Sequence, residues 1–153
     1  MEANMSRKLL GVLLAMMAFC AIVRAADDPF LGIWQLNGEK TSNYQQQSQM
    51  IINVPAPGGF TSYRATIGKD NQSSTETHPV AFDGKPYQTT GGDAREISYK
   101  RIDARTIERT QNRNGKISVD TEQVSEDGKT LTVKQANAVR VYDKQFNVQP
   151  VRR

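Results

Sequence analysis

The feature that most limits the fold of this chain is a series of short segments in which apolar and polar residues alternate. After residue 26, no segment has the 3.6-residue apolar period of an amphipathic helix. Alternation of period two predicts about nine short strands, at residues 31–36, 50–54, 62–67, 80–82, 97–100, 106–108, 117–122, 131–134 and 139–142. We expect one apolar face per strand.

Turn dipeptides separate several of these segments. Asn114-Gly115 and Asp127-Gly128 are sequences that accept the positive φ angles of tight hairpin turns. Strands joined by such short connections are antiparallel neighbours. Residues 95–133 are therefore expected to form a run of hairpins, whereas residues 38–47 are expected to form a short helix or a loop and residues 82–93 a surface loop.

Eight or nine antiparallel strands in one small domain form either a sandwich or a closed barrel. Leu, Ile, Val and Phe make up only roughly a fifth of residues 26–153, and a sandwich needs apolar residues from two facing sheets. A ligand-holding barrel needs fewer of them. The composition therefore favours the barrel.

The first 25 residues are typical of an export signal. Arg7-Lys8 precede an uncharged, mostly apolar run at 9–23, and Val23-Arg24-Ala25 offers a cleavage site. We expect residues 1–25 to be a cleaved signal peptide and residues 26–153 to form one exported domain, periplasmic or secreted, without a membrane span. The alternative is an uncleaved signal anchor.

Catalytic and metal-binding motifs are not evident in the sequence. Cys20 is the only cysteine and lies in the signal segment, which excludes disulfides, thiol catalysis and cysteine-based zinc sites in the mature domain. His78 is the only histidine, with only Glu76 nearby, and Asp120 and Glu122 are interpreted as solvated. The sequence predicts a protein that is not an enzyme and holds no metal or cofactor.

The charge of the chain does not indicate a nucleic-acid partner. The sequence pI is about 9.3 and the net charge is +4. The first 25 residues supply two of these positive charges, since they contain three basic residues, Arg7, Lys8 and Arg24, and one acidic residue, Glu2. The remaining basic residues are dispersed among acidic ones, which argues against a nucleic-acid surface.

Several motifs resemble those of a known family. Gly32-Ile33-Trp34 begins the first predicted strand, and Leu36-Asn37 and Lys40-Thr41-Ser42 follow it. This order is similar to the G-x-W opening of lipocalin-like, or calycin, barrels, and more closely to largely uncharacterised small exported bacterial proteins. Further matching segments are residues 82–87, 98–108, 114–116, 125–133 and 141–145. The resemblance implies a lipocalin-like antiparallel barrel over nearly all of the mature chain.

The same resemblance implies a structural plug at one end of the barrel. In calycins the tryptophan closes the barrel and a basic residue from a late strand packs over it. Gly32 and Trp34 match the motif, and Arg140, or alternatively Lys144, is expected to place its cation on the indole ring.

The candidate ligand-binding residues follow from the alternation. If Ile97 and Tyr99 face inward, so does Arg101, and if Ile107 faces inward, so does Arg109. An arginine inside a barrel needs an anion, so Arg101 and Arg109 are candidates for holding a ligand carboxylate or phosphate. Tyr63 and Tyr99 are expected to line the same cavity. The alternative is that both arginines lie at strand ends, in water.

Two functions are consistent with these patterns. The first is an exported, non-catalytic barrel that binds a small amphipathic or hydrophobic ligand. The second is an envelope protein-interaction module with a filled interior, which binds its partner through the loops at the open end. A cavity opposite Trp34 would favour the first function, and a filled interior with an exposed apolar patch would favour the second.

Overall fold

A computed structural model describes residues 28–146, so the expected signal peptide lies outside the described residues. Ten antiparallel strands form a single sheet. They are β1 (Gly32–Leu36), β2 (Gln46–Ala56), β3 (Gly59–Gly68), β4 (Ser73–Ala81), β5 (Tyr87–Gln88), β6 (Glu96–Asp103), β7 (Thr106–Arg113), β8 (Lys116–Val124), β9 (Thr130–Gln135) and β10 (Ala138–Phe146).

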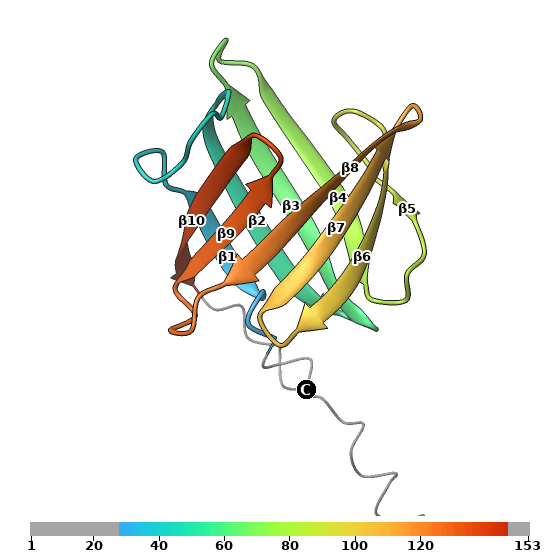
Figure 1. The fold of residues 1–153 in the computed structure, drawn as a ribbon. Coiled ribbons are helices and arrows are strands. Elements are labelled where there is room, and N and C mark those ends of the chain that lie inside the picture. The colour runs from blue at the N-terminus through green and yellow to red at the C-terminus, as the bar shows by residue number, and fades with distance from the viewer. Residues whose placement is uncertain (1–27, 147–153) are drawn as a thin grey trace, which may run out of the picture.

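The sheet curls into a nearly closed barrel (Figure 1). Its strand order is β4-β3-β2-β1-β10-β9-β8-β7-β6-β5, so the first strand pairs with the last. The seam between β4 and the β5–β6 region is held by Thr77 and Thr90, whose backbone groups exchange two hydrogen bonds of 2.8 Å. The barrel expected from the sequence is therefore present, with ten strands rather than eight or nine.

Two connecting segments differ in detail from the sequence expectation. The stretch 82–93, predicted to be a loop, contains the two-residue strand β5. The stretch 38–47 contains no helix; Ser42 forms an isolated bridge with Val139, and β2 begins within the stretch at Gln46. Both segments pack against the sheet because their backbone groups bond to it.

The hairpin turns form where the sequence predicts them. Asn114 and Gly115 have φ angles of 52° and 84° and connect the paired residues Arg113 and Lys116. A two-residue turn with positive φ at both positions matches the twist of antiparallel strands. This turn fixes the register of β7 and β8.

The interior of the barrel has an apolar end and a polar end. At the apolar end the side chains form one cluster with little or no exposed surface. Its members include Phe30, Leu31, Trp34, Ile51, Phe60, Val80, Ile97, Tyr99, Ile107, Val124, Leu131, Val133 and Tyr142. Because this cluster occupies only one half of the barrel, the chain needs few large apolar residues.

Trp34 closes the apolar end. It is fully buried, and its Nε1 donates a hydrogen bond of 2.9 Å to the carbonyl oxygen of Phe30. The cation over the indole ring is Lys144, whose Nζ lies 4.7 Å from the ring centroid. Arg140 instead lies over Tyr44, at 5.3 Å. The expectation that Arg140 packs over Trp34 is therefore wrong, and the alternative residue, Lys144, occupies that position.

Gly32 is required at the start of β1. Its φ angle is +126°, and a Cβ atom at this position would lie 2.5 Å from the carbonyl oxygen of Phe146. Any other residue would be strained in backbone conformation and would push β10 away. The glycine thus permits close pairing of the first and last strands beside Trp34.

The structure corrects the expected orientation of two strands, β3 and β8. On β3, Tyr63 and Ile67 are 44% and 43% exposed, whereas Arg64 is buried. On β8, Ile117 and Val119 are 66% and 52% exposed. In both strands the apolar face that the alternation identifies points outward, and the polar face points into the barrel.

Asp120 and Glu122 show the consequence on β8. They were expected to be solvated, but they are only 1% and 4% exposed. They are buried because arginine side chains from other strands surround them, which makes burial of a carboxylate tolerable. The interior of this protein therefore contains an ionic layer above the apolar one.

A charged cavity in the polar half of the barrel

A cavity of about 620 Å³ occupies the polar half of the barrel, away from Trp34. Its walls come from the strands and from the loops before β2 and β6. The lining residues are Asn43, Tyr44, Gln45, Gln46, Gln49, Arg64, Thr66, Ser74, Glu76, Gly92, Asp93, Arg95, Arg109, Gln111, Arg113, Lys116, Ser118, Gln135 and Arg140. Tyr44 is the only aromatic residue among them, and none of the lining residues is aliphatic.

Period-two alternation places the charged side chains in this cavity. On β3, Phe60 lies in the apolar cluster, and Arg64, four residues further on the same face, lies in the cavity wall. On β4 the same relation connects Val80 with Glu76. Since side chains on one face of a strand recur at every second residue, anchoring the apolar end fixes which residues enter the cavity.

Arg109 forms the centre of the ionic layer. Its guanidinium pairs with Asp120 and, at 3.0 Å from Nη1 to Oε1, with Glu122. Gln111 and Gln135 donate further hydrogen bonds to Asp120, of 2.8 Å and 3.1 Å. The charge of Arg109 is thus matched by acids of the protein itself.

The pKa values of this group favour the charged forms. Burial by itself would lower the pKa of Arg109, but the charges of Glu122 and Asp120 outweigh it and raise that pKa. Burial would raise the pKa of Glu122, but Arg109, Arg64 and Arg140 hold it below its ordinary value. Both groups therefore remain ionised at neutral pH.

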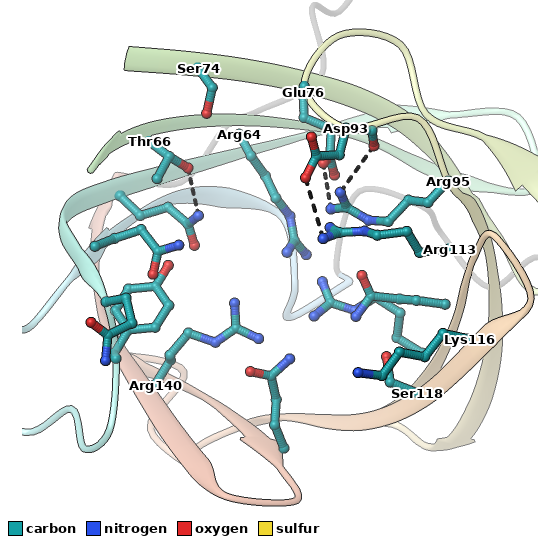
Figure 2. Close-up of a pocket in the computed structure, with 18 of the residues that line it drawn as sticks. Arg64, Thr66, Ser74, Glu76, Asp93, Arg95, Arg113, Lys116, Ser118 and Arg140 are labelled. Carbon is teal, nitrogen blue, oxygen red and sulfur yellow. Dashed lines mark hydrogen bonds and ion pairs between the residues drawn. The ribbon is translucent and has the colours of Figure 1, made fainter. Parts of the chain in front are cut away.

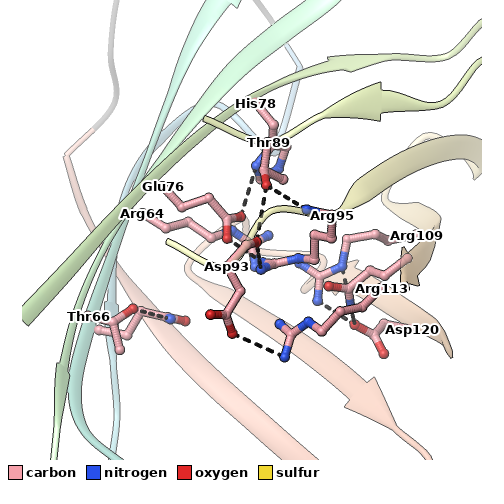
Figure 3. Close-up of polar contacts among 12 residues, drawn as sticks. Arg64, Thr66, Glu76, His78, Thr89, Asp93, Arg95, Arg109, Arg113 and Asp120 are labelled. Atoms are coloured by element: carbon pink, nitrogen blue, oxygen red, sulfur yellow. Dashed lines mark hydrogen bonds and ion pairs between the residues drawn. The ribbon is translucent and has the colours of Figure 1, made fainter. Parts of the chain in front are cut away.

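Three other arginines of the cavity also have acidic partners. Arg64 Nη2 lies 3.3 Å from Glu122 Oε1, and Arg113 Nη1 lies 3.3 Å from Asp93 Oδ2. Arg95 pairs with Glu76, as Figure 3 shows. In Figure 2 the guanidinium groups of Arg64 on β3, Arg113 on β7 and Arg95 in the loop before β6 converge on the cavity.

Arg140 differs from the other arginines of the cavity because its acidic partner is more distant than theirs. Its residue is 7% exposed, and its Nε and Nη2 atoms donate no hydrogen bond to any described residue. The nearest acid oxygen, Asp120 Oδ2, is 3.8 Å from Nη2. Figure 2 shows its guanidinium directed into the cavity. A nearly buried cation without a hydrogen-bond partner is costly, so the site is electrostatically incomplete.

The cavity as a whole has an excess of positive charge. Six cationic side chains line it, namely Arg64, Arg95, Arg109, Arg113, Lys116 and Arg140. Two acids line it and two more, Asp120 and Glu122, lie behind its wall. The described residues therefore leave a surplus of two positive charges around the cavity.

Glu76, His78 and Tyr99 form a buried polar chain below the cavity. His78 Nδ1 lies 3.1 Å from Glu76 Oε1, and His78 Nε2 lies 2.9 Å from the hydroxyl of Tyr99. Burial lowers the pKa of His78 to about 4. Burial would raise the pKa of Glu76, but His78, Arg64 and Arg95 lower it to about 2. The histidine is therefore neutral at pH 7 and connects a carboxylate to a phenol.

The four candidate ligand-binding residues occupy different places. Tyr63 is on the outer surface, so the expectation that it lines the cavity is wrong. Tyr99 is buried beneath the cavity, bonded to His78. Arg101 lies at the apolar end, paired with Asp28 and 4.1 Å from the ring centroid of Phe82. Of the four, only Arg109 reaches the cavity wall.

Sequence reasoning missed most of the cavity residues. Arg64, Arg95 and Arg113 were not singled out, and Arg140 was assigned to the tryptophan plug. The signal was present in β3, where Ser62, Arg64 and Thr66 form one face. Placing Tyr63 in the cavity puts this face on the opposite, solvent side, because polar faces of antiparallel strands usually face water.

Two further observations concern the described part of the chain. Among residues 28–146, no group of three or more His, Cys, Asp or Glu side chains is arranged to hold a metal ion. No helix within these residues has the length and apolar character needed to cross a membrane.

The strand order, the tryptophan plug and the internal cavity define a calycin-type β-barrel. A fatty acid binding protein of Schistosoma mansoni in complex with arachidonic acid has a similar structure, with a TM-score of 0.52 and 14% identity. The alignment covers 79% of this chain and 99% of that one. A variant of the fluorescent protein UnaG is also similar, with a TM-score of 0.55, 13% identity, and coverage of 78% and 99%. No family model and no curated protein matches the chain in sequence.

Proposed function

We propose that this barrel is a non-catalytic binding protein for a small molecule that carries an anionic group, held in the charged cavity. The observation that carries the proposal is Arg140, a nearly buried guanidinium in the cavity wall whose nearest acid oxygen, on Asp120, is 3.8 Å from Nη2. A carboxylate or phosphate matches the planar donor geometry of arginine and forms two charge-assisted hydrogen bonds with it.

The surplus of positive charge supports the same ligand class. Arg109 has two close acidic partners, Asp120 and Glu122, whereas Arg140 has, among the described residues, only Asp120 at 3.8 Å, so we assign the two arginines different roles. Arg109 holds the wall of the cavity together. Arg140, with Arg64 and Lys116 on the facing walls, offers charge that a ligand anion can complete.

The structural neighbours are compatible with this proposal. Arachidonic acid, present in the fatty acid binding protein structure, consists of a carboxylate and a hydrocarbon chain. The sequence patterns favoured an amphipathic or hydrophobic ligand for the present chain. The polar cavity wall supports the anionic end of an amphipathic ligand and offers no apolar lining for a purely hydrophobic one.

Catalysis is not part of the proposal. The Glu76–His78–Tyr99 chain resembles a proton relay, but the Tyr99 hydroxyl is buried beneath the cavity and does not line it. Burial also raises the pKa of Tyr99 to about 12. The Tyr99 hydroxyl therefore does not contact a ligand in the cavity. It also stays protonated at neutral pH, because its pKa is far above 7.

Titration of the purified protein with inorganic phosphate and with acetate tests the proposal. NMR chemical shifts or calorimetry should show saturable binding of at least one anion. Arg140→Gln should weaken it at least tenfold, because a charge-assisted hydrogen bond contributes about 1.5–3 kcal/mol. Arg105→Gln is the matched control, since Arg105 is an exposed cation in the β6–β7 turn. Absence of binding, or equal binding by both variants, contradicts the proposal.

The interaction-module alternative is supported by a different feature. The outer face of β2 and β3 exposes Met50, Tyr63 and Ile67, which is an apolar surface of the kind that proteins contact. That alternative also required a filled interior, and the cavity of about 620 Å³ argues against it. Failure of every anion to bind would make this outer face the better candidate.

We also propose that the domain acts after export, on the basis of the sequence of residues 1–25. Mass spectrometry of the protein recovered from its native host tests this directly. An N-terminus at Ala26 and recovery from the periplasm or medium are expected, and an intact N-terminus in the cytoplasm contradicts export.

A further inference from the structure

A second hollow lies beside the charged cavity, between β8 and the β9–β10 turn. Its volume is about 580 Å³. It arises because the β8–β9 ladder begins only at Thr121, paired with Lys134, so the first five residues of β8 have no partner on β9. Figure 1 shows the β7–β8 and β9–β10 turns diverging at this end of the barrel. The barrel wall is therefore interrupted at its polar end.

The lining of this lateral groove is more apolar than that of the cavity. Ile117 and Val119 on β8 and Ala136 and Ala138 at the β9–β10 turn contribute to it. Ile117 and Val119 are among the most exposed large apolar residues of the described chain, at 66% and 52%. Apolar side chains kept exposed next to a strand gap commonly mark a binding surface.

The groove lies next to the charged cavity, and Asp120 of the ionic layer also lines it. Asn43, Ser118 and Gln135 line both hollows. Gln135 also donates a hydrogen bond of 3.1 Å to Asp120, which places it at the edge of the ionic layer. These three polar side chains therefore lie between the groove and the arginines of the cavity.

From this adjacency we infer that the ligand is a single-chain amphiphile whose anionic head lies in the charged cavity and whose hydrocarbon chain leaves through the lateral groove. The inference rests on the proposed anion-binding function and adds the class and orientation of the ligand. The cavity holds the head because it has surplus positive charge. The chain lies against Ile117 and Val119 because burying apolar surface there lowers the free energy.

Comparing probes that share a head group and differ in chain length tests the inference. The purified protein is titrated with inorganic phosphate and octyl phosphate, and in parallel with acetate and octanoate. We expect the octyl compound of the preferred head group to bind at least tenfold more tightly than its short counterpart. The two series also show whether the head is a phosphate or a carboxylate.

Variants locate the chain. In the double variant Ile117→Ser with Val119→Ser, the affinity ratio between the octyl and the short probe should fall to near one. Ile102→Ser is the matched control, because Ile102 is 51% exposed on β6, away from the groove, and it should keep the wild-type ratio. Methyl resonances of Ile117 and Val119 should shift with octyl phosphate and not with phosphate.

Each other outcome overturns the inference in a distinguishable way. Equal binding of the octyl and the short probe contradicts the groove and leaves anion binding intact. Tighter octyl binding that the double variant does not change places the chain elsewhere. If none of the four probes binds, both the inference and the proposed function are wrong.

Discussion

The guanidinium of Arg64 on β3 lies 3.3 Å from the carboxylate of Glu122 on β8, across the interior of the barrel. The two residues are 58 positions apart in the chain and belong to strands that are not neighbours in the sheet. Glu122 also forms an ion pair with Arg109. This contact joins opposite walls at the level where most small domains have only apolar side chains.

Removing Glu122 should therefore destabilise the whole barrel. Glu122→Gln leaves Arg64 and Arg109 buried with less compensating charge, and breaking a buried ion pair costs about 3–5 kcal/mol. We expect the free energy of unfolding in urea to fall by about 3 kcal/mol. Glu126→Gln, an exposed position in the β8–β9 turn, should change it by less than about 0.5 kcal/mol. Equal effects would show that the ionic layer does not stabilise the fold.

Arg109 and Arg140 should respond oppositely to removal of their charges. Arg109→Met leaves the buried carboxylates of Asp120 and Glu122 without their main cation. It should lower the free energy of unfolding by about 3–5 kcal/mol. Arg140→Met removes a nearly buried cation whose only acidic partner among the described residues, Asp120, is 3.8 Å away. Asp120 keeps its bonds to Arg109, Gln111 and Gln135, so stability should stay within about 1 kcal/mol or rise. Thermal and urea unfolding of the two variants measure this. A large loss of stability in Arg140→Met would mean that its charge serves the fold rather than a ligand.

His78 should make stability depend on pH between pH 7 and pH 5. Its pKa is about 4 in the folded protein and ordinarily 6.5. As the pH falls through 6.5 the unfolded chain binds a proton that the folded protein does not, so acidification favours unfolding. The expected loss between pH 7 and pH 5 is about 2 kcal/mol.

His78→Gln provides the control for this prediction. His78 is the only histidine of the chain, and the pKa of Glu76 is lowered to about 2, so that carboxylate does not titrate in this range. Urea midpoints of the variant should therefore be nearly constant from pH 7 to pH 5. A wild-type protein with the same flat profile would contradict the buried neutral histidine.

Lys144 should contribute to stability and to the spectrum of the single tryptophan. Its ammonium lies over Trp34 and donates a hydrogen bond of 3.2 Å to the carbonyl oxygen of Pro29. Lys144→Met should lower the free energy of unfolding by about 1–2 kcal/mol and shift the fluorescence of Trp34. Lys134→Met, an exposed position on β9, should do neither. An unchanged emission spectrum in the Lys144 variant would contradict the contact.

The sequence predicts the barrel because its local signals are strong. The Asn114-Gly115 turn and the alternation on either side of it specify a hairpin without reference to the rest of the chain. The resemblance to the calycin opening predicts that Trp34 is enclosed, and Trp34 is fully buried in the apolar cluster. The additional strand, β5 (Tyr87–Gln88), is not predicted, because two residues are too few for a periodic pattern.

The orientation of β3 and β8 was not predictable from local alternation. Alternation identifies two faces of a strand and leaves open which one is inside. The choice is normally made by hydrophobicity, and here Arg64, Asp120 and Glu122 reverse it because they neutralise one another. Such compensation between distant residues is not visible in a window of ten positions, so local alternation does not predict the charged lining of the cavity.

The pairing of β1 with β10 also determines when the chain can fold. Trp34 and Lys144 are partners in this ladder although they are about 110 positions apart. Contacts between such distant positions slow folding, and until β10 is available β1 and β9 both have an unpaired edge that invites aggregation. The barrel therefore closes only after β10 has been made, so an intermediate that lacks β10 needs protection from other chains.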